Sequence, residues 1–255
     1  VELELNKIRF PQWNDSEGLT ALERFNKEVL NGFKTRYSDN NTAAKNRLEH
    51  ELKVIIKLGF HEYFLILWDI FNFCRKSNIP TGPGRGSAAG SLVVYCLGIT
   101  NVDPLKYNLI FERFLNESRV SPPDIDSDIC QVRRDEVIEY LKHKYGQDSI
   151  AKIGTLMKIY PRTAIREIGK RLEIPFDFLA KVEKRVPEGP NISFKELLKI
   201  DPELQELQKE NPAFFKNAIG LEGKPIHTGS HAAGIIISDQ PLSNLIPLSK
   251  DKGTD

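Results

Sequence analysis

The sequence has almost no net charge, so no excess of one sign points to a function. It contains 36 lysines and arginines against 35 aspartates and glutamates, for a formal net charge of +1. A domain that binds nucleic acid usually carries a basic patch or stripe. Any surface for phosphate must therefore be local in this chain.

Cysteines are scarce and scattered. Cys74, Cys96 and Cys130 form no CxxC pair, and their number is odd. This pattern is typical of a reducing cytosol, and it excludes a disulfide framework. His227 and His231 are the only closely spaced histidines, and with no cysteine beside them a structural zinc site is not expected.

Long apolar runs are absent. The first residues lack the basic region and apolar run of a signal peptide, and the apolar patch Tyr63–Ile70 is too short to cross a bilayer. We therefore expect a cytoplasmic protein with no membrane partner. At 255 residues, 40% of them hydrophobic, the chain fits one large or two modest globular domains. Its valine start and Lys-Gly-Thr-Asp end suggest a piece of a longer protein.

Helical periodicity dominates the chain, with a few strand-like segments, so we expect an α+β fold. Strands are predicted at 1–10, 150–153 and 235–238. Helices are predicted at 19–33, 42–57, 61–77, 88–96, 135–145, 162–172, 176–186, 193–200, 202–210 and 212–219.

The most informative stretch is Ser121–Cys130, in which Asp124, Asp126 and Asp128 occupy alternate positions. If the segment is extended, all three carboxylates lie on one face. Carboxylates so placed repel one another unless a cation lies between them, and Mg²⁺ prefers such oxygen ligands. Two Mg²⁺ ions could then support a phosphoryl transfer. A solvated acidic turn after Pro122 and Pro123 is the alternative.

A glycine-rich stretch precedes the acids, with glycines at positions 82, 84, 86 and 90. Glycine allows positive φ angles and a close approach to a ligand, and Ser87 is a suitable N-cap for the helix at 88–96. A glycine turn before a helix N-terminus suits phosphate. Ser87 stands where the Walker A motif needs lysine. A dinucleotide fingerprint at 84–89, with Asp103 as its acid, and a purely structural turn remain alternatives.

These motifs carry a resemblance. Gly-Pro-Gly-Arg-Gly-Ser at 82–87, Phe-Glu-Arg-Phe-Leu-Asn at 111–116 and Pro-Asp-Ile-Asp-Ser-Asp at 123–128 resemble the catalytic α subunit of bacterial DNA polymerase III, a C-family polymerase. The likeness continues at 153–155, 164–169 and 231–236. The glycine motif resembles the standard α subunit rather than the Gram-positive form with a built-in proofreading domain. Pro122 and Ser127 depart from the family's usual methionine and apolar residue.

The resemblance implies a palm related to the DNA polymerase beta-like nucleotidyltransferases, with a mixed sheet and helices, plus a helical thumb. We expect the first part of the palm at 1–159, the thumb at 160–220 and a return to the palm at 221–255. It implies a DNA-directed DNA polymerase of bacterial chromosome replication. Its expected partners are primer-template DNA and deoxynucleoside triphosphates, and its cofactor is two Mg²⁺ ions, for which Mn²⁺ can substitute.

By the same resemblance, Asp126 and Asp128 are the catalytic metal ligands and Asp124 is a supporting acid. The expected nucleotide or phosphate contacts are Gly84, Arg85, Gly86, Ser87, Arg113 and Arg119. The expected DNA contacts of the thumb are Lys158, Arg162, Arg166, Lys181, Lys184 and Arg185.

The family's third catalytic aspartate lies in a Lys-x-Asp-Phe-Leu-Gly motif that this sequence lacks. Asp239, Asp251 and Asp255 are candidates by default. We therefore expect the chain alone to be inactive or impaired, and expect a sliding clamp and other replisome subunits to bind only through regions absent from it. A template-independent nucleotidyltransferase and an inactive DNA-binding module are the alternatives.

Overall fold

The computed structural model describes residues 9–38, 40–118, 123–188 and 192–250. The chain divides into two compact units: Val1–Ala151 with Ile236–Leu248, and Lys152–Ile235 with Ser249–Asp255. We call them unit 1 and unit 2. The strand predicted at 1–10 lies almost wholly outside the described residues. No helix within these ranges has the length and apolar character that crossing a membrane requires.

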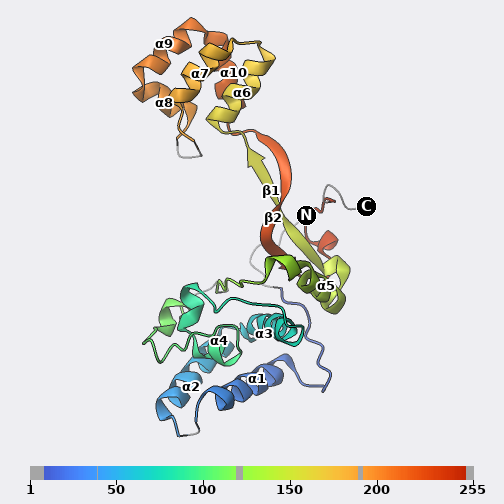
Figure 1. Cartoon of the computed structure of the whole chain (residues 1–255). Helices are drawn as coiled ribbons and strands as arrows, with labels where there is room; N and C mark the ends of the chain where they lie inside the picture. The colour runs from blue at the N-terminus through green and yellow to red at the C-terminus, as the bar shows by residue number, and fades with distance from the viewer. Residues whose placement is uncertain (1–8, 39, 119–122, 189–191, 251–255) are drawn as a thin grey trace. The chain divides into compact units, whose positions relative to one another are not determined.

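The described part of unit 1 contains five α-helices (Figure 1). Phe25, Phe64, Phe111 and Phe114 are buried at its centre, which explains why α1 packs on both α3 and α4. The helices predicted at 19–33, 42–57, 61–77 and 135–145 are confirmed within a few residues. The bounds are α1 Ala21–Arg36, α2 Thr42–Lys57, α3 His61–Lys76, α4 Leu92–Cys96 and α5 Arg134–Tyr145.

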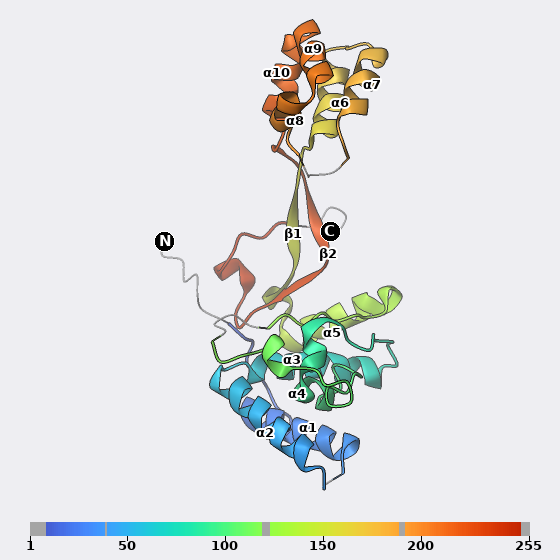
Figure 2. The ribbon, with the colours of Figure 1, turned by 90° about the vertical axis from the view of Figure 1, so that its left-hand side faces the viewer.

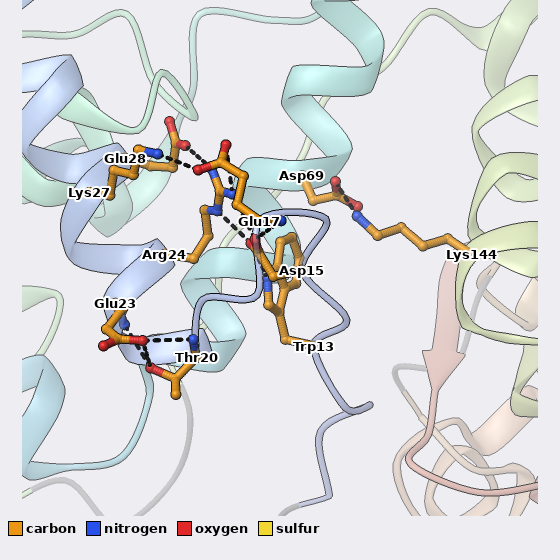
Figure 3. A network of polar contacts seen from close by, with 10 residues as sticks. All are labelled: Trp13, Asp15, Glu17, Thr20, Glu23, Arg24, Lys27, Glu28, Asp69 and Lys144. Carbon is orange, nitrogen blue, oxygen red and sulfur yellow. Dashed lines mark hydrogen bonds and ion pairs between the residues drawn. The ribbon is translucent and has the colours of Figure 1, made fainter.

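Polar contacts fasten the segment before α1 to that helix (Figure 3). Thr20 and Glu23 form a capping box at the start of α1, the arrangement that satisfies two otherwise unpaired N–H groups. Arg24 reaches back to Asp15 through two hydrogen bonds of 2.6 and 2.8 Å. Arg24 holds the pKa of the Asp15 carboxyl well below its usual range.

The described part of unit 2 contains five α-helices, which lie together in both views (Figures 1 and 2). Prolines occupy the first turns of α6, α9 and α10, where proline's missing N–H is harmless. Phe194, Phe214 and Phe215 are fully buried in their core. The bounds match the predicted helices closely: α6 Pro161–Arg171, α7 Phe176–Arg185, α8 Phe194–Ile200, α9 Pro202–Glu210 and α10 Pro212–Leu221.

The described chain contains one sheet, of two strands, β1 Ile150–Lys158 and β2 Pro225–Ile237. Both are longer than the strands predicted at 150–153 and 235–238. The N–H of Ile159 donates to Lys224, and the N–H of Ser238 donates to Ser149, so the pair is antiparallel. The helices and this sheet make the chain α+β, as expected.

Strand β2 is bulged. Between the two flanking hydrogen bonds it has 13 residues against nine in β1, so four residues of β2 have no counterpart. Nδ1 of His231 accepts hydrogen bonds from the N–H groups of Ala233 and Gly234 at 3.1 and 2.8 Å. His231 therefore makes a structural hydrogen bond within β2.

The helix predicted at 88–96 begins later than expected. Residues 86–90 form a 3₁₀ turn, and the α-helix starts only at Leu92, with Ser91 rather than Ser87 as its N-cap. The acidic segment, for which an extended conformation was considered, does not form a regular strand. It makes a single isolated antiparallel bridge, between Thr81 and Ile129, because no neighbouring strand continues the pairing within the described residues.

Candidate active site

The glycine loop and the acidic segment are joined by a short antiparallel pairing. The N–H of Gly82 donates to the carbonyl of Asp128 at 2.8 Å, and the N–H of Cys130 donates to the carbonyl of Pro80 at 2.9 Å. The bridge between Thr81 and Ile129 lies between these bonds. Two segments more than forty residues apart in sequence are therefore held edge to edge.

Three glycines permit this arrangement, each for its own reason. A Cβ on Gly82 would lie 2.8 Å from the Cβ of Asp128, and one on Gly84 would lie 2.5 Å from Oγ1 of Thr100. Gly84 and Gly86 also have positive φ angles, +92° and +70°, which side chains with a Cβ rarely adopt. The glycines were predicted to let the loop backbone come close to a ligand. In the structure they let it come close to Thr100 and to the acidic segment of the protein itself.

The carboxylates of Asp126 and Asp128 share one cation, the guanidinium of Arg85. Nη1 of Arg85 lies 2.9 Å from Oδ2 of Asp126, and Nε lies 3.2 Å from Oδ1 of Asp128. The three side chains are between 45% and 59% exposed, so the group is open to solvent. Arg85 therefore occupies the place between two carboxylates in which a metal ion would also be stabilised.

Tyr63 of α3 anchors the acidic segment from the core side. Its hydroxyl accepts a hydrogen bond from the backbone N–H of Ile125, and burial, with the nearby charges of Asp124 and Asp126, raises its pKa to about 12. Ile125 itself is buried in the core of unit 1. In the sequence, position 63 stands out only as the first residue of the apolar patch Tyr63–Ile70. Its periodicity carries no signal for this contact, which joins residues 62 positions apart.

The N-terminus of α4 already binds an anionic side chain of the protein. Glu51 of α2 is fully buried, and its carboxylate accepts hydrogen bonds from the N–H groups of Leu92 and Val93, both at 3.0 Å. The hydroxyl of Ser91 donates to Glu51 at 2.7 Å, and Arg47 pairs with it at 2.6 Å. A protein carboxylate thus takes the anion position at the N-terminus of α4. The phosphate contacts predicted at residues 84–87 lie before that helix and are not made by Glu51.

The two acids suit Mg²⁺. This ion binds through one or two carboxylates and keeps water or phosphate in its other positions, and Asp126 and Asp128 provide two exposed carboxylates beside a glycine without a Cβ. Oδ2 of Asp126 is 4.0 Å from the place where a Cβ of Gly86 would lie. No group of three or more histidine, cysteine, aspartate or glutamate side chains within the described ranges is arranged to hold a metal.

The other predicted site residues either form no ion pair with Arg85, Asp126 or Asp128 or lie outside the described residues. Arg113 ends the 3₁₀ turn Phe111–Arg113 with an exposed side chain, and Arg119, Asp251 and Asp255 are outside the described residues. Asp239 pairs with Arg9 at 3.3 Å.

The dinucleotide alternative is wrong. Asp103 ends no strand; it accepts a hydrogen bond from the hydroxyl of Tyr37 at 2.6 Å.

Half of the predicted DNA contacts are engaged inside unit 2. Arg162 bonds to the carbonyl of Val186 and to Glu188, Arg166 forms two hydrogen bonds with Glu183, and Arg185 pairs with Asp201 and Glu203. Lys158, Lys181 and Lys184 are exposed and form no ion pair with any described acid.

Comparison with known proteins identifies the family of the chain. The family model for the bacterial DNA polymerase III alpha NTPase domain matches residues 23–255. The DNA polymerase III subunit alpha of Borreliella burgdorferi is 46% identical over 226 residues, covering 88% of this chain and 20% of that protein. Its counterpart from Halalkalibacterium halodurans is 44% identical over 257 residues, covering 99% of this chain. That of Bacillus subtilis is 38% identical over 253 residues and covers 98%. The chain spans 20–23% of the length of these three relatives.

Proposed function

Because the chain belongs to the bacterial DNA polymerase III alpha family, we propose that it carries part of the active site of a DNA-directed DNA polymerase. The function is nucleotidyl transfer from a deoxynucleoside triphosphate to a primer 3′-hydroxyl. The observation that carries the proposal is the pairing of the glycine loop with Asp126 and Asp128, joined by Arg85. In this proposal, the part of the chain that holds the glycine loop and the two acids is a palm of the polymerase beta-like kind, and α6–α10 form the thumb.

In this proposal Asp126 and Asp128 hold two Mg²⁺ ions, with a third aspartate from outside the described residues. Bound Mg²⁺ lowers the pKa of the attacking hydroxyl and neutralises charge on the leaving pyrophosphate. The guanidinium of Arg85 releases the two carboxylates and binds the triphosphate, because its planar array of donors suits phosphate oxygens. Tyr63 and Ile125 fix the backbone between the acids, so catalysis is mainly positioning and charge stabilisation.

For the grip on DNA, the exposed lysines are better placed than the paired arginines. Lys181 and Lys184 lie three residues apart on α7, so they share one helix face, and Lys158 ends β1. Their contacts would be to phosphates and independent of base sequence. Arg162, Arg166 and Arg185 would first have to leave their acidic partners.

The test is a calorimetric titration of Mg²⁺ or Mn²⁺ in the presence of dATP, on the chain and on the variant Asp126→Asn/Asp128→Asn. We expect metal-dependent nucleotide binding that the variant loses, because an amide cannot supply the negative charge that the metal requires. Asp148→Asn, an exposed acid outside the site, is the matched control and should bind like the parent. Equal binding by the parent and the double variant would refute the site.

The rival functions predict other results. A template-independent nucleotidyltransferase needs the same acids but no DNA grip, so affinity for a primer-template duplex separates it from a polymerase. An inactive DNA-binding module would bind duplex with no dependence on Asp126 and Asp128.

A further inference from the structure

Two arginines of unit 1 meet at the end of α4. The guanidinium carbon of Arg36, from the end of α1, lies 3.8 Å from the centroid of the Tyr95 ring. Nη1 of Arg75, from the end of α3, donates to the carbonyl of Gly98 at 2.8 Å. The N–H of Gly98 donates in turn to the carbonyl of Tyr95 at 3.0 Å. Three helices therefore bring two positive charges to a single helical turn.

Neither arginine has an acidic partner among the described residues. This distinguishes them from the arginines of unit 1 that pair with carboxylates, Arg9, Arg24, Arg47, Arg85 and Arg133. Asp103 is already engaged, since it accepts hydrogen bonds from the hydroxyl of Tyr37 and the N–H of Leu105. Partial burial and then the charge of Arg36 lower the pKa of Arg75, so the two cations repel each other where they stand.

Capping of the helix explains only one of the two. Positive side chains near a helix C-terminus bind its last carbonyl groups and complement its dipole. Arg75 does so at Gly98. Arg36 binds no carbonyl of α4; it stacks on Tyr95 and donates to Oδ1 of Asn101 at 3.4 Å. A second guanidinium held beside the first, without an acid between them, is a binding geometry for a phosphate.

The arginine pair is linked to the glycine loop through Asn101. The N–H of Asn101 donates to the carbonyl of Pro83 at 2.8 Å, and the hydroxyl of Thr100 donates to the same carbonyl at 2.8 Å. The pair thus belongs to the surroundings of the candidate active site, yet neither arginine contacts Asp126 or Asp128. A polymer with many phosphates can reach both places at once, whereas the triphosphate is already assigned to the acids and Arg85.

We propose that Arg36 and Arg75 form a second phosphate-binding site, which takes a backbone phosphate of bound DNA. The inference rests on the proposed polymerase function. The pair would fix the path of one strand next to the glycine loop. It is sequence-independent, because phosphate oxygens carry no base information.

The test compares the chain with Arg36→Gln/Arg75→Gln, using fluorescence anisotropy on a duplex with a single-stranded template overhang at 50–200 mM salt. Loss of one or two phosphate contacts should reduce the slope of log K against log salt by about 1–2. The parent's affinity should then fall about 4- to 16-fold more than the variant's over this salt range. The matched control is Lys45→Gln/Lys53→Gln, which removes two exposed charges of α2 and should keep the parent's slope.

Four outcomes are distinct. A reduced slope in the arginine variant alone, with dATP affinity in Mg²⁺ unchanged, supports the site. An unchanged slope overturns it while the polymerase proposal stands. A loss of dATP affinity without a change in DNA binding assigns the pair to the nucleotide and also overturns it. A parent chain that binds no DNA refutes the proposed function and this inference together. Thermal unfolding of both double variants at the parent's temperature would show that neither result reflects misfolding.

Discussion

At the level of single residues, Arg85 is the cation that contacts both acids of the candidate site. In the described structure it neutralises Asp126 and Asp128 together, so it would compete with a metal ion for them. In the proposed reaction, the same guanidinium would become a ligand for the triphosphate. One residue would then have opposite effects on the two binding steps.

We predict that Arg85→Ala raises the affinity for Mn²⁺ in the absence of nucleotide. The same variant should lower the affinity for dATP in the presence of Mn²⁺. A unit charge at about 4 Å in a water-like dielectric is worth about 1 kcal/mol, or roughly a fivefold change in the dissociation constant of the metal. Calorimetry measures both constants. Lys53→Ala, exposed on α2, is the control, and changes of the same sign in both constants would contradict the assignment.

At the level of elements, the short helix α4 depends on α2. Its first N–H groups bond to the buried carboxylate of Glu51, and Arg47 of the same helix binds the carbonyls of Gly90 and Leu109 at 2.8 and 3.1 Å. Burial raises the pKa of Glu51, and its four donors act in the opposite direction. Glu51 and Arg47 of α2 thus fix the segment that follows Gly86 and Ser87. The C-terminal side of the glycine loop is therefore stabilised by a helix that lies far away in sequence.

We predict that Glu51→Gln destabilises unit 1 by about 3 kcal/mol, because breaking a buried ion pair leaves Arg47 without its partner. The neighbouring exposed change Glu49→Gln removes the same charge without a buried contact and should shift stability by less than about 0.5 kcal/mol. Denaturant unfolding measures both. Equal stability of the two variants would mean that the contacts of Glu51 contribute little to the fold.

For the whole molecule, the packing of the segment before α1 sets a dependence of stability on acid. The pKa values of Asp15 and Glu17 are lowered in the folded chain, chiefly by Arg24 for Asp15 and by Lys27 for Glu17. A carboxyl whose pKa is lower in the folded state stabilises that state above its unfolded pKa, and the contribution is lost as the pH falls through the folded value.

We therefore predict that the stability of the chain declines as the pH drops below about 4, the ordinary pKa of these groups. Asp15→Asn should make the chain less stable at pH 7 and weaken the decline between pH 4 and pH 2, because that variant has no proton to take up at this position. Thermal unfolding across this range measures both effects. A variant that loses stability in acid as steeply as the parent would show that other groups dominate.

Local patterns predicted the helices of this chain better than its strands. Apolar spacing located the helices of both units, because this signal acts within one or two helical turns. Strands β1 and β2 extend well beyond the predicted 150–153 and 235–238. The glycine loop and the alternating acids were also visible, since each is a run of neighbouring residues. The error at 88–96 had a local cause too: Ser87 and Ser91 are both good N-caps, and no pattern along the chain chooses between them.

The contacts that assemble the site could not be read this way, because they join residues distant in sequence. Glu51 selects Ser91 as the start of α4 from 40 positions away, Tyr63 reaches Ile125 across 62, and Arg85 bridges acids 41 and 43 residues later. Composition and spacing supplied the chemical groups of the site. Packing brought them together, because a buried carboxylate is stable only where several donors converge, and that convergence exists only once the helices have folded against one another.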